Sequence, residues 1–132
     1  MIDYSEDPST LDPSMLEGFF VGWPAAPSPE QHLAVLRGSF RSIVALDGGK
    51  VVGFVNMISD GVLTAFIPWL EVLPGYQGQG IGTELMRRVL EGSERFYSVD
   101  LLCDEELRPY YEKLGMLRVP GMTLRHRSAL AR

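Results

Sequence analysis

Three glycines, at positions 78, 80 and 82, stand in a segment suited to bind a charged ligand. They lie in a short loop between an apolar, β-rich run that ends near Val72 and an amphipathic run that begins near Ile81. The first N–H groups of a helix lack intrahelical acceptors and carry partial positive charge, and glycines leave such donors open to a phosphate. The pattern predicts a pyrophosphate cradle made by backbone N–H groups of the glycine-rich loop and the first turn of the helix. A loop whose glycines serve only a tight turn is the alternative.

Two common phosphate motifs do not fit this loop. A nucleotide-triphosphate loop needs a Gly-Lys-Ser/Thr sequence, and residues 73–84 contain no lysine. A dinucleotide fold needs Gly-x-Gly-x-x-Gly, whereas the glycines here follow Gly-x-Gly-x-Gly. Asp100 lies about twenty residues further on, as the ribose-binding acid of such a fold does, but it comes near the start of its predicted strand and not at the carboxyl end.

Four other side chains are candidates for chemistry. Glu71 interrupts an apolar strand beside the loop, where an acid is costly unless it is paired or useful, so it is a candidate general base. Asp104 follows the predicted strand over residues 99–103 and is either a second candidate base or the N-cap of the next helix. Cys103 lies within that strand with no histidine near it in sequence, which favours an inert core thiol. Tyr111 carries a phenol, which has a pKa of about 10 and can donate a proton while neutral.

The elements that must position these residues follow from apolar spacing and turn residues. Ser28 before Pro29 predicts a helix start, and glycines near positions 48 and 61 predict strand-connecting turns. The strands over residues 62–72 and 99–103 are expected to be parallel across the helix that joins them. The expected helices cover residues 13–20, 29–39 (burying Leu33, Leu36 and Phe40), 80–95 and 105–114, and the expected strands cover 42–46, 50–59, 62–72, 99–103 and a closing hairpin of 116–119 and 122–125. The result is a mixed α/β sandwich of one sheet with helices on its faces.

Two segments resemble the GNAT N-acetyltransferase superfamily. Gln77-Gly78-Gln79-Gly80-Ile81-Gly82 is similar to its [Gln/Arg]-x-x-Gly-x-[Gly/Ala] acetyl-CoA signature, and residues 109–116, Pro-Tyr-Tyr-Glu-Lys-Leu-Gly-Met, look like its Phe-Tyr-Glu-Lys-Leu-Gly-Phe segment. The resemblance extends over nearly the whole chain. It implies a GNAT-like fold, with a central mixed, mostly antiparallel sheet, helices on both faces and a splayed parallel strand pair. It further implies an acyltransferase that moves an acetyl group from acetyl-CoA directly to a primary amine, with no metal.

The resemblance also assigns roles to residues. Tyr111 matches the tyrosine that often protonates the departing thiolate in this family, and Glu71 is the candidate base, although several family members use a water chain instead. Backbone groups of two strand residues are expected to pair with the pantetheine arm in the gap between the splayed strands. The predicted cofactor-binding residues are Leu70, Val72, Gln77, Gly78, Gln79, Gly80, Ile81, Gly82 and Thr83.

The acceptor is expected near residues 19–24, the Asp60 turn and residues 66–69. Aromatic and acidic side chains there would suit the amine of a small molecule or a peptide, and ordinary core packing is the alternative for the aromatic ones. A non-catalytic acyl-CoA-binding or regulatory module is the alternative function, and modification of charged tRNA is a weaker one. Because many relatives dimerise through their last strands, the resemblance also suggests a homodimer.

Length and composition limit the remaining possibilities. The 132 residues predict a single domain over residues 1–132, and a net charge of −5 argues against nucleic-acid binding. One cysteine excludes an internal disulfide, and two histidines, His32 and His126, give a poor inventory for a metal and are expected at the surface or on a helix face. No apolar run approaches the roughly 20 residues of a membrane span, and the acidic opening segment lacks a secretory apolar region. A cytoplasmic location is therefore expected.

Overall fold

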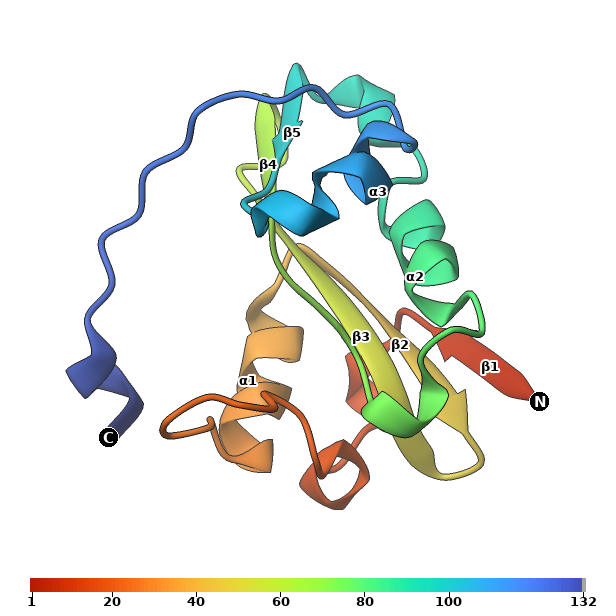
Figure 1. The fold of residues 1–132 in the computed structure, drawn as a ribbon. Helices are drawn as coiled ribbons and strands as arrows, with labels where there is room; N and C mark the ends of the chain where they lie inside the picture. Colours follow the sequence, from red (N-terminus) through yellow and green to blue (C-terminus); the bar gives the residue numbers. More distant parts are fainter. Residues whose placement is uncertain (132) are drawn as a thin grey trace.

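The computed structural model describes residues 1–131 and contains a five-stranded sheet with the order β1-β2-β3-β4-β5 (Figure 1). The strands β1 to β4 run antiparallel to their neighbours, and β5 is parallel to β4. The predicted mixed, mostly antiparallel sheet with one parallel pair is therefore confirmed. The strands are β1 (Ile2–Ser5), β2 (Arg41–Asp47), β3 (Lys50–Ser59), β4 (Thr64–Val72) and β5 (Ser98–Asp100), and the α-helices are α1 (Pro29–Gly38), α2 (Ile81–Val89) and α3 (Arg108–Glu112).

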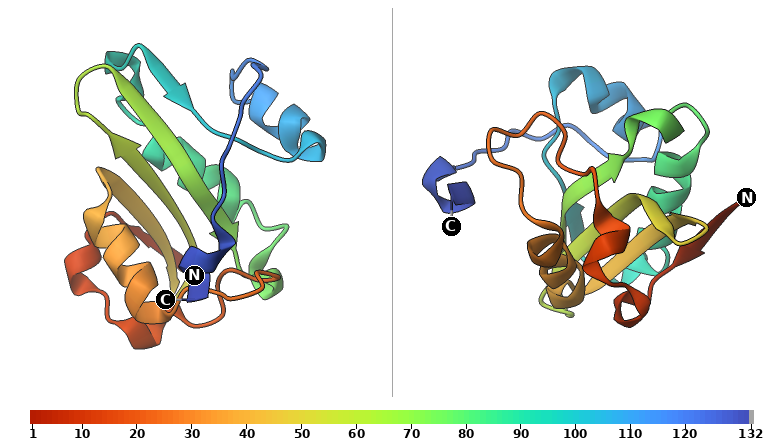
Figure 2. Two further views of the ribbon diagram at one scale, coloured as in Figure 1. Left: turned by 90° about the vertical axis from the view of Figure 1, so that its left-hand side faces the viewer. Right: turned by 90° about the horizontal axis from the view of Figure 1, so that it is seen from below.

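Helices cover both faces of the sheet, with α1 on one side and α2 on the other (Figures 1 and 2). Alternation along β3 sends the neighbouring residues Gly53 and Phe54 to opposite faces. Phe54 is buried on the α1 side, where its ring centroid lies 4.3 Å from that of His32. On the other side, a Cβ at Gly53 would lie 3.1 Å from Leu85 and 3.2 Å from Ile81. The missing side chain at Gly53 therefore lets α2 pack closely on the sheet.

The start of α1 is formed as the sequence predicts. The hydroxyl of Ser28 accepts a hydrogen bond from the N–H of Gln31, and the Gln31 side chain accepts one from the N–H of Ser28, which completes a capping box. Leu33 and Leu36 are buried on the inner face of α1. Phe40 was expected to share that face and does not, because it lies beyond the end of the helix and is 40% exposed.

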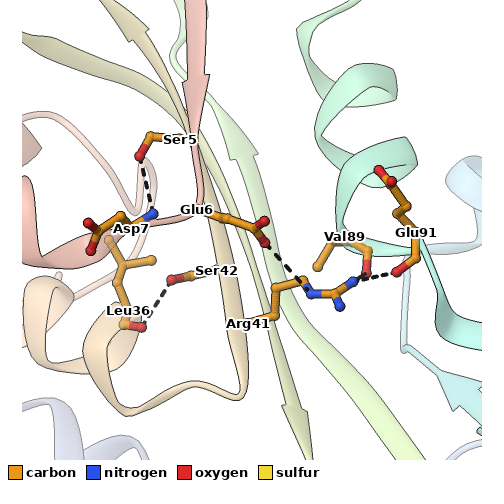
Figure 3. A network of polar contacts seen from close by, with 8 residues as sticks. All are labelled: Ser5, Glu6, Asp7, Leu36, Arg41, Ser42, Val89 and Glu91. Atoms are coloured by element: carbon orange, nitrogen blue, oxygen red, sulfur yellow. Dashed lines mark hydrogen bonds and ion pairs between the residues drawn. The ribbon is translucent and has the colours of Figure 1, made fainter.

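The C-terminal end of α2 is held by Arg41 of β2 (Figure 3). Its Nη1 donates hydrogen bonds to the carbonyls of Val89 and Glu91 at 3.0 and 2.6 Å, and its Nε lies 3.9 Å from a carboxylate oxygen of Glu6. The last carbonyls of a helix have no intrahelical partner and carry partial negative charge, so a guanidinium is a suitable partner for them. This contact fixes one end of α2 to the sheet.

The parallel strands β4 and β5 pair only over residues 64–66 and 98–100. Beyond Phe66 the register of β4 against β3 shifts, because Ile67 and Pro68 lie opposite a single residue of β3. Pro68 also has no N–H to donate to a ladder. The bulge lies where the two parallel strands diverge, so the expected splayed pair is present.

Several predicted elements are shorter than expected. The helix predicted over residues 80–95 ends at Val89, because the chain turns at Gly92, where φ is 75°. The strand predicted over residues 99–103 is β5, which ends at Asp100. The helices predicted over residues 13–20 and 105–114 are instead a 3-10 turn, η2 (Pro13–Leu16), and a 3-10 turn, η5 (Glu105–Leu107), followed by α3.

The closing hairpin predicted over residues 116–125 is wrong. Residues 116–126 have no regular secondary structure, and Figure 1 shows them, in blue, running past the end of the sheet and then away from it. Apolar alternation predicts strands only where a neighbouring edge can receive them, and β5 is too short to supply that edge. Four apolar side chains of this arm therefore stand in solvent with high exposed fractions: Leu117 87%, Val119 74%, Met122 97% and Leu124 82%. Within the described part of the chain, no helix has the length and apolar character needed to cross a membrane.

Candidate active site

The glycine loop joins the end of β4 to the start of α2, as predicted. After a 3-10 turn, η3 (Pro74–Tyr76), the chain passes through Gly78 and Gly80 with φ values of 79° and 82°, a left-handed conformation that favours glycine. Gly80 is the N-cap of α2. A Cβ at either glycine would meet no atom within 4 Å, so the space beside the loop is open.

The backbone N–H groups of this loop point to no protein partner. Among the described residues, none of the N–H groups of residues 78–83 has an acceptor, and the next N–H, of Glu84, donates to the carbonyl of Gly80 at 3.1 Å. These donors stand at the positive end of the α2 dipole. They therefore form an anion-binding concavity of the kind that the sequence predicts.

Side chains at the base of the loop hold it in place. The Gln77 amide donates a hydrogen bond to the carbonyl of Val72 at 3.0 Å. The hydroxyl of Tyr76 donates one to the carboxylate of Asp47 at 2.6 Å, which ties the loop to the β2–β3 turn. The loop is thus fixed through its side chains while its backbone donors stay available.

A cleft opens where β4 and β5 diverge. It is a cavity of about 410 Å³ on the β5 side of β4. Residues 67–70 line one wall of the β5-side cavity, residues 101–104 line the other, and Tyr111 and part of the 116–126 arm complete it. We call this β5-side cavity the cleft.

The edge of β4 that faces the cleft carries unpaired backbone groups. The N–H of Leu73 donates to the carbonyl of Val52 in β3 at 2.9 Å, so the peptide groups of Leu70 and Val72 face the opposite side, away from β3. The carbonyl of Val72 accepts from the side chain of Gln77. Within residues 1–131, the N–H of Val72 and both backbone groups of Leu70 have no strand partner, as an extended ligand in the cleft would require.

The two adjacent tyrosines of α3 face different surroundings. Tyr111 lines the cleft, and burial raises the pKa of its phenol to about 12. Tyr110 turns toward the start of α2, where its hydroxyl lies 3.2 Å from the hydroxyl of Thr83. Tyr111 is therefore the tyrosine placed for proton donation in the cleft, and Tyr110 braces α3 against the glycine loop.

Glu71 lies on the α1 face of β4, in the second cavity, of about 360 Å³. Its two carboxylate oxygens accept hydrogen bonds from the N–H groups of Phe20 at 2.9 Å and Val21 at 3.3 Å. The acid is thus paired, as its half-buried position requires. Trp69 and Leu70 line both the second cavity and the cleft, so the two cavities meet at the same part of β4.

Asp60 and Cys103 differ from expectation, whereas Asp104 lies where its predicted roles require. Asp60 was expected beside the acceptor. It lies in the turn between β3 and β4, where its carboxylate accepts hydrogen bonds from the N–H groups of Val62 and Leu63. Asp104 stands at the start of η5 without making a capping hydrogen bond, and it lines the cleft. Cys103 was expected inside a strand, but it lies past the end of β5, partly exposed, in the wall of the cleft.

Phe20, Trp23 and Trp69 of the expected acceptor region line the second cavity, but sequence reasoning missed two features near it. Phe20 has a φ of 62°, the sole positive value at a non-glycine position in residues 1–131, and packing with the bond to Glu71 maintains this strained conformation. His32, expected at the surface or on a helix face, lies on the buried face of α1, is only 1% exposed and stands among aromatic rings with both ring nitrogens unpartnered. No local pattern announces either feature, because both depend on contacts with the distant strands β3 and β4.

Comparison with known proteins gives one consistent family. Residues 9–116 match the model of the Acetyltransferase (GNAT) family. Among solved structures, a candidate acetyltransferase from Deinococcus radiodurans R1 is 43% identical and superposes with a TM-score of 0.94. The alignment covers 98% of this chain and 92% of the other chain. A GNAT-family acetyltransferase from Streptococcus pneumoniae TIGR4 is 30% identical, with a TM-score of 0.78 and coverage of 96% of this chain and 99% of its own.

A curated relative is similar over a shorter stretch. The chloroplastic GCN5-related N-acetyltransferase 3 of Arabidopsis thaliana is 38% identical over 80 residues, which is 58% of this chain and 34% of that protein. The chain therefore spans about a third of the length of this relative.

Proposed function

Because the chain belongs to the GNAT acetyltransferase family, we propose that it uses acetyl-CoA to acetylate a primary amine of a small molecule or a peptide. Membership makes the chain an N-acetyltransferase, hence a transferase, and members of the family act on amine-bearing substrates. The proposal adds the donor, the residues that hold it and those that move protons.

One observation carries the proposal: an open strand edge and an anion-binding loop lie close together in the chain, separated by a single 3-10 turn. The unpaired N–H groups of residues 78–83 suit a pyrophosphate, and the unpaired backbone groups of Leu70 and Val72 suit an amide-bearing arm in the cleft. CoA carries both chemical features on one molecule. The open space beside Gly78 and Gly80 leaves room for it.

Bound acetyl-CoA would supply the acetyl group, with a C–N bond forming to the amine as the C–S bond breaks, the amine losing one proton and the CoA sulfur gaining one. Tyr111 is the proposed proton donor, since its side chain belongs to a residue that lines the cleft. With its pKa raised by burial to about 12, the phenol stays protonated at neutral pH and is available as an acid.

The proposed base takes the proton from the acceptor amine. Glu71 is our first candidate, because the two backbone donors hold its carboxylate beside the junction of the two cavities. A carboxylate has about four lone-pair sites, so two bonds leave capacity for a substrate proton or a bridging water. Asp104 is the second candidate, since its side chain makes no cap and lines the cleft.

The chain offers a specific probe for the donor site, because Cys103 is its single cysteine and lies in the cleft wall. We expect saturating CoA to slow alkylation of Cys103 by iodoacetamide at least several-fold. Gly82→Glu should abolish this protection, since it places a negative charge among the loop donors. A Cβ at position 82 meets only ordinary contacts, 3.8 Å from Val72 and 3.9 Å from Tyr110, so the variant should fold.

Gly82→Gln is the matched control, because it adds a side chain of the same size without the charge. It should retain more protection than Gly82→Glu. If CoA leaves the alkylation rate of the folded parent protein unchanged, the donor assignment is wrong. Protection without release of CoA from acetyl-CoA across a panel of amines would instead favour the non-catalytic acyl-CoA-binding module.

We further propose a homodimer in which the arm of residues 116–126 contacts a second copy. The support is the high exposure of its apolar side chains and the position of β5 at the end of the strand order, with no neighbour on its outer side among the described residues. Light scattering after size exclusion should give twice the chain mass for the parent. Leu117→Glu with Leu124→Glu should give a monomer, while Val62→Glu, at a highly exposed apolar position outside the arm, should not. A monomeric parent at micromolar concentration would rule out this assembly.

A further inference from the structure

Three aromatic rings surround the part of the second cavity that lies next to Glu71. Phe20, Trp23 and Trp69 all line this cavity. Their ring centroids lie 5.0 Å apart for Phe20 and Trp23, 5.1 Å for Trp23 and Trp69, and 6.5 Å for Phe20 and Trp69. We call these three residues the aromatic corner. Trp69 is 40% exposed, so one wall of the corner is accessible to a ligand.

The angles between the rings indicate what the aromatic corner can hold. The ring planes meet at 60°, 63° and 89°, so no two of them form the parallel slot into which a flat aromatic ligand stacks. Steeply inclined rings instead present faces and edges to a rounded group. Ammonium groups and the methylenes beside them bind well against such surfaces, by cation–π attraction and apolar contact.

The charge of the cavity also favours a cation. Glu71 is the single ionisable side chain in its lining, and no lysine, arginine or histidine lines it. In residues 1–131 the carboxylate of Glu71 takes part in no salt bridge; its partners are the two backbone N–H groups of the Phe20 segment. Backbone donors orient the carboxylate without supplying a neutralising cation, so its negative charge stays available to a ligand.

Phe20 connects the carboxylate of Glu71 with the aromatic corner. The N–H that binds Glu71 belongs to the same residue whose ring forms one side of the aromatic corner. Its backbone has a left-handed φ of 62°, and a strained residue of this kind persists only where surrounding contacts determine it. One residue thus fixes the distance between the negative charge and the aromatic surface.

We propose that the aromatic corner and Glu71 form the acceptor subsite, and that it selects a primary ammonium at the end of an unbranched alkyl chain. The ammonium lies at Glu71, and the methylenes lie against Trp23 and Trp69. The cavity, of about 360 Å³, is large enough for a chain of this kind. An amine with a carboxylate close to it is disfavoured, because that group would be repelled by Glu71. This inference rests on the proposed function for the donor side but concerns the acceptor.

The chain carries a built-in reporter for this subsite. Trp23 and Trp69 are its two tryptophans, and both line the cavity, so intrinsic fluorescence reports on the subsite without acetyl-CoA. The protein is titrated with 1,5-diaminopentane and with Nα-acetyl-lysine N-methylamide, which represent a free diamine and a lysine in a peptide. Neutral 1-pentanol tests the need for charge, and benzylamine tests the need for an alkyl chain.

We expect a saturable fluorescence change with at least one of the two alkyl amines, and binding at least tenfold weaker for 1-pentanol and benzylamine. Glu71→Gln should weaken binding roughly tenfold, because a charge-assisted contact is lost. Glu94→Gln, which removes the same charge from an exposed position in the turn after α2, is the matched control and should bind as the parent does. Trp23→Leu, checked for folding by circular dichroism, should also weaken binding, because it removes an aromatic ring and leaves the charge of Glu71 in place.

The outcomes separate this inference from the proposed function. Binding by the diamine alone or by the lysine derivative alone supports the subsite and identifies the source of the amine. The subsite is rejected if 1-pentanol binds as tightly as the alkyl amines, or if Glu71→Gln and Trp23→Leu bind the alkyl amines as tightly as the parent does. It is also rejected if no ligand changes the fluorescence. Protection of Cys103 by CoA in a protein whose tryptophans do not respond to amines would leave the donor assignment standing and reject the acceptor subsite alone.

Discussion

Replacing His32 by leucine should stabilise the protein and change how its stability depends on pH. The imidazole is 1% exposed, neither ring nitrogen has a partner, and its neighbours are the rings of Phe19, Phe20 and Phe54. Burial lowers the pKa of His32 from 6.5 to about 4 in the folded protein. Leucine has a similar volume, a higher helix propensity and no polar atom to leave unpaired.

The magnitude follows from the two pKa values. The unfolded chain binds a proton at His32 near pH 6.5 and the folded protein does so only near pH 4, so the histidine lowers stability progressively as pH falls between these values. Lowering the pH from 7 to 5 should therefore cost the parent about 2 kcal/mol that His32→Leu does not lose. At pH 7, removing the unpaired ring nitrogens should add roughly 1–3 kcal/mol.

Urea unfolding at pH 7, 6 and 5, followed by circular dichroism, measures both effects as the difference between variant and parent. His126→Gln, at the other and exposed histidine, controls for removal of a histidine in general. A difference between His32→Leu and the parent that stays constant from pH 7 to pH 5 would refute the reasoning. It would mean that the imidazole is hydrated or has a polar partner in solution.

Three further predictions concern α2 and the cleft. Arg41→Met should lower the free energy of unfolding by about 1–2 kcal/mol, because the last carbonyls of α2 lose their donor; urea unfolding measures this, and an unchanged midpoint would contradict it. Tyr111→Phe should lower kcat by about 100-fold or more with little change in KM for acetyl-CoA, and the parent rate should show no loss from Tyr111 ionisation up to pH 10, because burial raises its pKa to about 12. Gly80→Ala should destabilise the fold by roughly 1–2 kcal/mol and weaken CoA binding, because its φ of 82° disfavours a side chain; Gly75→Ala, where a Cβ meets nothing and φ is not positive, should do neither in thermal melts and CoA titrations.

The parts of the site that sequence reasoning predicted are those fixed by neighbours along the chain. Ser28 caps α1 through a residue three positions away, and the glycine loop acquires its free donors from the helix that it opens. The resemblance of residues 109–116 to the family's segment led to Tyr111, and the structure places this tyrosine in the lining of the cleft. Local chemistry was sufficient for the helix cap and the glycine loop, and the resemblance was needed for Tyr111.

The acceptor side depended on contacts that no local pattern encodes. Glu71 binds the N–H of Phe20, 51 residues earlier in the chain, and this contact makes the left-handed backbone of Phe20 tolerable. His32 occupies a helix position that a polar residue normally exposes, and it is buried because Phe54 and the Phe20 segment close over it. The missing hairpin has the same origin, since alternation beyond residue 116 needs a strand edge that β5 does not provide.

Gly53 lines neither cavity, yet it determines how far the glycine loop lies from β4. A side chain there would press on Leu85 and Ile81 and move α2 outward by a few tenths of an ångström, carrying the loop donors at its start away from β4. A ligand held at one end by that loop and at the other by the edge of β4 must match the span between them. The distance between α2 and β3 therefore sets the length of ligand that fits between the loop and β4. The glycine at position 53 of β3 keeps this distance short.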